Sequence, residues 1–111
     1  MNKRKRERID FACDVILETK DGKSCYANSR DISMNGIFLK TDNSLPVATE
    51  GKIYITMQLG DEKKKVAAQF KVVRTVKDSL YDDEIGMCLE IFGLDTESSI
   101  NLYNMIRYNK K

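Results

Sequence analysis

Two short polar segments carry the side chains best suited to bind a ligand, and the first of them is basic. Residues 3–8 read Lys-Arg-Lys-Arg-Glu-Arg, so that Arg4 and Arg8 are separated by three residues. A guanidinium group can bind phosphate oxygens or the O6/N7 edge of guanine through two parallel hydrogen bonds, and it can stack on a purine ring. Two such groups together could hold a compact dianion. The alternative is a solvated charged terminus that binds nothing.

The second segment is Asp31-Ile32-Ser33-Met34-Asn35-Gly36, in which acceptors and a glycine are closely spaced. The carboxylate of Asp31 can accept the N1–H and N2–H2 donors of guanine, and the hydroxyl of Ser33 can bond a base or a phosphate. Gly36 allows a close approach that a Cβ atom would prevent. The alternative is an ordinary turn, because Asp and Ser often bond their own backbone in turns.

Alternating hydrophobic residues predict the strands that must position these segments. Residues 9–17 alternate strictly, and Asp21-Gly22 favours a tight hairpin connection to the next strand. Further strands are expected at about 23–30, 36–41, 52–59, 66–76 and 81–92. Gly86, within the last of them, is expected to mark a bulge or a close approach of two backbones.

After residue 94 the hydrophobic period changes to that of a helix, expected at about 95–108 with Asp95 or Thr96 as the N-cap. Leu102, Tyr103 and Ile106 are expected to share its buried side. Six strands followed by one helix predict a mainly β fold, namely a six-stranded antiparallel barrel with the C-terminal helix over one end. The sequence thus divides into a flexible basic arm, residues 1–8, and one barrel domain, residues 9–111.

Composition excludes several classes of function. The 111 residues contain no histidine, the commonest general base near neutral pH and a common metal ligand, so we expect neither an enzyme nor a metal or other cofactor. Cys13, Cys25 and Cys88 form no CxxC pair and are expected to be reduced core thiols. No run approaches the ~20 apolar residues of a membrane span. We therefore expect a cytoplasmic protein without membrane insertion.

The two polar segments together resemble the signature of the PilZ domain, R-x-x-x-R before the first strand and [D/N]-x-S-x-x-G between the second and third. Lys71-Val72-Val73-Arg74 is similar to a family strand that ends in a basic or aromatic residue, and Glu84-Ile85-Gly86-Met87 is similar to a later strand. The resemblance covers nearly the whole chain. It implies a six-stranded PilZ-type barrel that binds cyclic di-GMP on its outer face.

The resemblance also implies a role for each matching residue. Arg4 and Arg8 would contact phosphate and guanine, Asp31 and Ser33 would hold a guanine edge, and Gly36 would leave space beside them. Lys5 would add a phosphate contact, and Arg74 would stack on or border a base. For Arg74 the alternative is a strand-end arginine that extends into solvent.

The expected function is therefore that of a receptor without catalytic activity. Cyclic di-GMP would order the arm and change the nearby surface, and a separate, unidentified downstream protein would recognise that change. One alternative is a PilZ-like adaptor that works through protein contacts and does not bind cyclic di-GMP. A small barrel that binds RNA or single-stranded DNA is disfavoured, because the sequence has no tryptophan and most of its aromatic residues fall in the phases expected to face the core.

Overall fold

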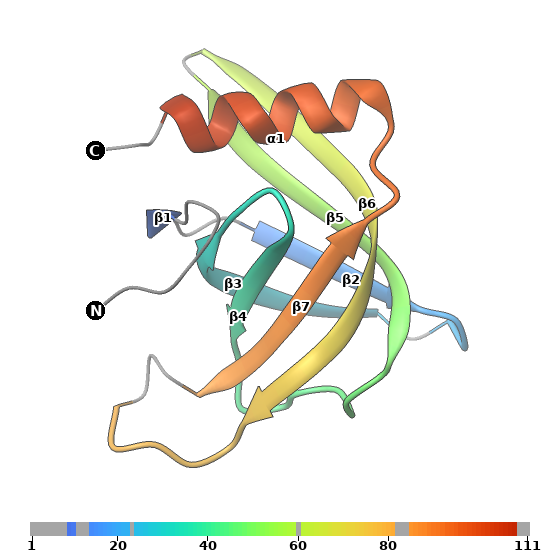
Figure 1. The fold of residues 1–111 in the computed structure, drawn as a ribbon, viewed down its shortest axis with the longest axis vertical. Coiled ribbons are helices and arrows are strands. Elements are labelled where there is room, and N and C mark those ends of the chain that lie inside the picture. Colours follow the sequence, from blue (N-terminus) through green and yellow to red (C-terminus); the bar gives the residue numbers. More distant parts are fainter. Residues whose placement is uncertain (1–8, 11–13, 23, 60, 82–84, 109–111) are drawn as a thin grey trace.

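The computed structural model describes residues 9–10, 14–22, 24–59, 61–81 and 85–108, in which seven strands precede one helix (Figure 1). The elements are β1 (Ile9–Asp10), β2 (Asp14–Thr19), β3 (Ser24–Ile32), β4 (Gly36–Lys40), β5 (Glu50–Leu59), β6 (Glu62–Val76), β7 (Gly86–Phe92) and α1 (Thr96–Tyr108).

The strand pairings form an antiparallel barrel. β3 pairs with β2 on one side and with β4 on the other, so the pairings run through β3, β2, β5, β6, β7 and β4 and return to β3. The predicted mainly β class and the six-stranded antiparallel barrel with a C-terminal helix are confirmed. β1 is a two-residue addition that pairs with β3 alone.

The first predicted strand corresponds to β1 and β2, and residues 11–13 between them lie outside the described residues. Asp10 is paired with Asp31, and Asp14 is paired with Asn28. The step from Asp10 to Asp14 is therefore one residue longer than the matching step along β3. A strictly alternating sequence does not reveal such a change of register, because each half still alternates.

The core lies inside the barrel, lined by the inward side chains of the strands. Along β6 every second residue from Val66 to Val72 is buried, and Ile53, Ile55 and Met57 of β5 are buried opposite them. This is the alternation expected of strands with one buried face. The predicted hairpin turn is also present, since Gly22 has a φ of 87° and its N–H donates to the Thr19 carbonyl at 3.0 Å.

Helix α1 covers one end of the barrel, beside the β5–β6 hairpin (Figure 1). Asp95 is the N-cap, because its Oδ1 accepts the Ser98 N–H at 2.7 Å. The Ser98 hydroxyl in turn accepts the Ala67 N–H at 3.0 Å, which links the helix to β6. Leu102, Met105 and Ile106 are buried against the core.

The predicted burial of Tyr103 is wrong. Its side chain is 53% exposed, whereas Met105 is fully buried. The buried stripe follows the i, i+3 and i+4 positions from Leu102, and Tyr103 lies about 100° around the helix from Leu102. Tyr103 therefore faces solvent.

β7 begins at Gly86 rather than near residue 81, because pairing with its two neighbours begins at Gly86. A Cβ atom on Gly86 would lie 1.9 Å from the Leu39 carbonyl oxygen of β4. The sequence-based expectation of a close backbone approach is thus confirmed. Of the described residues, no helix is long and apolar enough to cross a membrane.

Candidate functional site

The segment from Asp31 to Gly36 forms the tight connection between β3 and β4. The Ser33 N–H donates to the Gly36 carbonyl at 2.8 Å, and the Ser33 hydroxyl accepts the Asn35 N–H at 3.4 Å. The Asn35 carbonyl accepts the N–H of Ile91 in β7 at 2.9 Å. The turn is therefore bonded internally and also fixed to a third strand.

Asp31 lies at the end of β3, on the outer side of the barrel. Its neighbour Ile32 is part of the core, so the alternation of side chains directs Asp31 outward. The side chain is nevertheless only 2% exposed, and that of Ser33 only 3%. Both predicted ligand-binding side chains are thus close together and largely shielded from solvent.

One row of paired residues runs from Asp31 across the outer face of the barrel. Asp31 is paired with Phe38 in β4, Phe38 with Cys88 in β7, and Cys88 with Arg74 in β6. Directly opposite residues of antiparallel strands project to the same side. We call these four residues the outer row. Its ends are three strand spacings apart along the curved barrel wall, a path of roughly 14 Å at about 4.8 Å for each spacing.

Arg74 reaches the outer row through a β-bulge. The register between β6 and β7 shifts between Val72 and Arg74, and Val73, the residue inserted there, is 50% exposed. In an unbroken alternation Arg74 would share the phase of the buried residues Val66 to Val72. The bulge moves Arg74 to the outside instead, where it is exposed. Its Nη2 donates to the Cys88 sulfur at 3.6 Å.

The predicted arm residues Arg4, Lys5 and Arg8 lie outside the described residues. Their position relative to the outer row therefore stays a prediction, as does the arm of residues 1–8. Within the described part of the chain, Asp31 lies in β3, Ser33 in the turn that follows it, and Gly36 at the start of β4. Arg74 lies in β6, which is separated from β4 by β7 (Figure 1).

Sequence reasoning missed three residues of this face. Phe38 and Lys40 project outward because Ile37 and Leu39 are core residues, and Cys88 projects outward between Met87 and Leu89. The signal that could have found them is the same alternation that predicted the strands. Cys88 has a free thiol and is half-buried outside the core cluster, so its predicted place in the core is wrong. The side chains of Cys13 and Cys25 lie outside the described residues.

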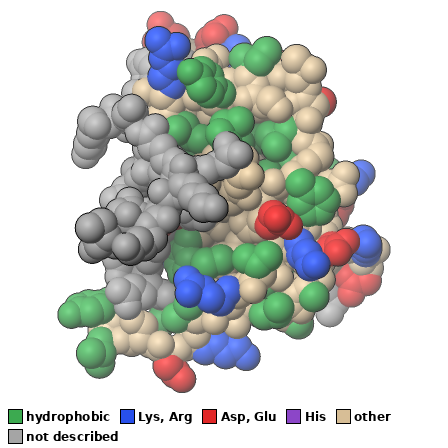
Figure 2. Space-filling view, in the orientation of Figure 1, with side chains coloured by type: hydrophobic (Ala, Val, Ile, Leu, Met, Phe, Trp, Pro, Cys, Tyr) green, Lys and Arg blue, Asp and Glu red, His purple; other side chains and the backbone are tan. Residues whose placement is uncertain are grey.

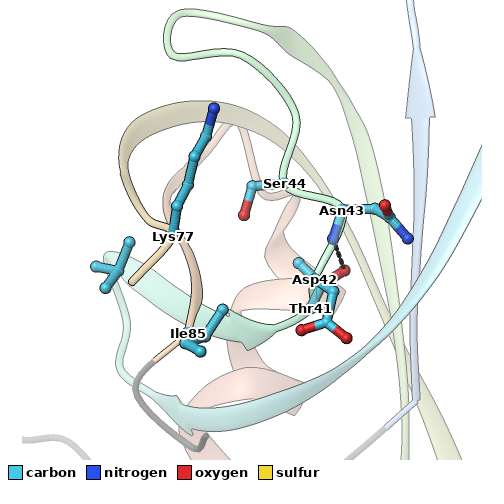
Figure 3. Close-up of a pocket in the computed structure, with 7 residues that line it drawn as sticks. Thr41, Asp42, Asn43, Ser44, Lys77 and Ile85 are labelled. Atoms are coloured by element: carbon cyan, nitrogen blue, oxygen red, sulfur yellow. Dashed lines mark hydrogen bonds between the residues drawn. The ribbon is translucent and has the colours of Figure 1, made fainter. Parts of the chain in front are cut away.

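A separate cleft of about 420 Å³ opens at the end of the barrel opposite α1 (Figure 3). The following residues line it: Thr41, Asp42, Asn43, Ser44, Val76, Lys77 and Ile85. The Thr41 hydroxyl accepts the Asn43 N–H at 3.0 Å, and the Thr41 N–H donates to the Ile85 carbonyl at 3.3 Å. Of the sequence-predicted site residues that the structure describes, none lines this cleft.

The charges of the described surface are mixed rather than sorted by sign. Figure 2 shows basic and acidic side chains interspersed over the visible face. The outer row itself contains one anion, Asp31, and one cation, Arg74. Among the described residues, no group of three or more Cys, Asp and Glu side chains could hold a metal ion. This face is therefore suited to a ligand with both hydrogen-bond donors and a stacking or anionic group.

Solved structures with a similar fold include those of three bacterial proteins. The Bacillus subtilis inhibitor of motility MotI/DgrA has a TM-score of 0.77 and 18% identity over 96% of this chain, which spans 52% of that protein. The PilZ domain with c-di-GMP of Escherichia coli YcgR has a TM-score of 0.64 and 16% identity over 98% of this chain and 92% of that domain. The PilZ domain of CeSA from a cellulose-synthesizing bacterium has a TM-score of 0.58 and 17% identity, over 91% of this chain and 95% of that domain.

At these identities the similarity establishes the fold alone. No curated protein sequence matches the chain significantly. A family model described as PilZ domain, however, matches residues 2–107, which is nearly the whole sequence. The chain therefore belongs to the PilZ domain family.

Proposed function

We propose that this protein is a cytoplasmic receptor for cyclic di-GMP that has no catalytic activity and regulates a separate protein. The observation that carries the proposal is the outer row, in which one barrel face combines Asp31, beside the Ser33 turn, with Arg74. Membership of the PilZ family supports the choice of ligand, as does the c-di-GMP complex of the E. coli YcgR domain.

The side chains at the two ends of the outer row complement the two guanines of this ligand. Cyclic di-GMP has two guanines joined by a ring of two riboses and two phosphates. The carboxylate of Asp31 accepts the N1–H and N2–H2 donors of one guanine, with the Ser33 hydroxyl beside it. Arg74, roughly 14 Å away along the barrel wall, stacks on the other guanine.

The phosphates would lie between the two ends. Lys40 projects outward from β4, two residues from Phe38, and is exposed. In this proposal it provides a phosphate contact together with Arg4, Lys5 and Arg8, which the family signature assigns to the ligand. Gly36 leaves room for the ligand beside the turn.

The burial of Asp31 and Ser33 indicates how binding is coupled to a change of surface. Side chains that are 2% and 3% exposed cannot contact a ligand until the groups over them move. Ligand binding therefore exposes the segment from Asp31 to Gly36 and rearranges what covers it. A partner protein that recognises the rearranged surface would respond to the ligand.

The same burial favours one alternative, an adaptor that has the PilZ fold but binds no cyclic di-GMP. In that case Ser33 serves only to hold the β3–β4 turn, where it bonds Asn35 and Gly36. Its partner contacts would then be the same with and without the dinucleotide.

Calorimetric titration of the purified protein with cyclic di-GMP distinguishes the two functions. The receptor predicts saturable binding that Asp31→Asn weakens at least 10-fold, because the amide cannot replace a charge-assisted acceptor worth about 1.5–3 kcal/mol. Asp42→Asn, an exposed acid of the separate cleft, is the matched control and should leave affinity unchanged. Cyclic di-AMP should not bind. Absence of binding by the wild-type protein, with an unchanged melting temperature, would favour the adaptor.

A further inference from the structure

The side chain of Arg74 is held by a neighbour rather than simply extended into solvent. Its Nη2 lies 3.6 Å from the sulfur of Cys88, which is its directly opposite partner on β7. The bulge at Val73 creates this pairing, because without the register shift a different residue of β6 would face Cys88. The contact is therefore a consequence of the local backbone.

Such a contact lowers the entropic cost of stacking an exposed arginine on a base. The long side chain has about 2 kcal/mol of rotamer entropy, which is lost when the guanidinium group is fixed. A neighbour that already holds it reduces the part of this cost that falls on binding. The thiol is a weak acceptor, so it can hold the group without competing strongly with a ligand.

The surroundings of Cys88 fix the sulfur itself. Its other cross-strand partner, Phe38, projects to the same outer side and is only 3% exposed. A half-buried side chain directly opposite such a well-packed ring has less freedom to move. The sulfur is thus a rigid support for the guanidinium group.

We propose that Cys88 is a positioning residue of the ligand site: it holds Arg74 over the outer face so that the guanidinium group is pre-arranged to stack on the second guanine. The inference rests on the proposed function. Cys88 itself makes no contact with the base and acts through Arg74. Both ends of the outer row then contribute to selectivity, Asp31 by hydrogen bonding and the Arg74–Cys88 pair by stacking.

A double-mutant cycle on cyclic di-GMP affinity tests this role. Arg74→Ala should weaken binding roughly 10-fold, within the range of a stacked cation at a partly desolvated site. Cys88→Ala should weaken it roughly 3-fold, since the guanidinium group remains but is no longer held. Cys88→Ser keeps an acceptor at the same position and should stay within about 2-fold of the wild type. The double variant should bind as Arg74→Ala does, because Cys88 has no effect once Arg74 is absent.

A second readout compares ligands. Against the hybrid cyclic GMP-AMP, in which an adenine replaces one guanine, Cys88→Ala and Arg74→Ala should change the preference for cyclic di-GMP in the same direction. Melting temperatures within about 3 °C of the wild type should show that all variants fold.

Three results would overturn the inference while leaving the proposed receptor function intact. The first is an unchanged cyclic di-GMP affinity in Cys88→Ala, and the second is an affinity of Cys88→Ser as low as that of Cys88→Ala. The third is an equal loss of affinity from Cys88→Ala in the wild-type protein and in Arg74→Ala. The last result would show that Cys88 acts only on the structure of the strand. Absence of any binding by the wild-type protein would instead refute the proposed function, and the inference with it.

Discussion

Replacing Gly86 by alanine should destabilise the barrel more than any ordinary surface substitution. The new Cβ atom would lie 1.9 Å from the Leu39 carbonyl oxygen and 2.9 Å from its carbonyl carbon, whereas ordinary contact begins at 3.4 Å. The backbones of β4 and β7 must therefore separate by about 1.5 Å at this point. The atoms in the way are main-chain atoms, which a side-chain rotation cannot move.

The expected loss of stability follows from the hydrogen bonds that hold β4 and β7 together near Gly86. Lys40 is paired with Gly86, and the Thr41 N–H donates to the Ile85 carbonyl at a length of 3.3 Å. Loss of about two backbone hydrogen bonds at about 1 kcal/mol each, together with about 1–3 kcal/mol of overpacking, gives about 3–5 kcal/mol. At roughly 4 °C per kcal/mol for a domain of this size, the melting temperature should fall by roughly 12–20 °C.

Urea unfolding followed by circular dichroism measures this effect, and Gly22→Ala is the control. Gly22 has a positive φ of 87°, but a Cβ atom there meets nothing within 4 Å, so only the backbone conformation opposes the substitution, at about 1–2 kcal/mol. If Gly86→Ala proves no more destabilising than Gly22→Ala, the close approach of β4 and β7 is not as the structure has it.

Three further predictions concern the helix and the ligand. Asp95→Ala removes the cap of the Ser98 N–H and should lower the free energy of unfolding by about 1 kcal/mol, measured by urea titration; an unchanged midpoint would contradict the cap. Leu102→Ala should cost about 2–5 kcal/mol and Tyr103→Ala less than about 0.5 kcal/mol, and the reverse order in thermal unfolding would refute the assigned helix face. Cyclic di-GMP affinity should decrease as salt is raised from 50 to 500 mM, because its two phosphates are bound by cations; salt-independent titrations would exclude this electrostatic contribution.

The elements that could be predicted from the sequence are those marked by short-range patterns, such as alternating hydrophobic residues, turn dipeptides and helix caps. The alternation in β5 and β6, the Asp21-Gly22 turn and the Asp95 cap each follow from chemistry within a few residues. The position of the segment from Asp31 to Gly36 at the junction of two neighbouring strands was also predictable from local patterns, whereas its role in ligand binding stays a prediction. The roles assigned to Arg4, Lys5 and Arg8 stay predictions.

Several features that the sequence does not reveal depend on strand register. A bulge between Val72 and Arg74 moves the arginine to the outer face, and no particular side chain marks the inserted residue Val73. The change of register between Asp10 and Asp14 is hidden in the same way. Cys88 was wrongly expected in the core, although the alternation with the buried residues Met87 and Leu89 places it on the outer face.

The most direct test of the central claim is a two-dimensional NMR titration of the isotope-labelled protein with cyclic di-GMP. The account predicts saturable shifts of the backbone amides from Asp31 to Gly36 and of those at Arg74 and Cys88, with little change in the amides of α1. Unperturbed spectra at millimolar ligand, or shifts confined to the cleft around Thr41 and Lys77, would contradict it.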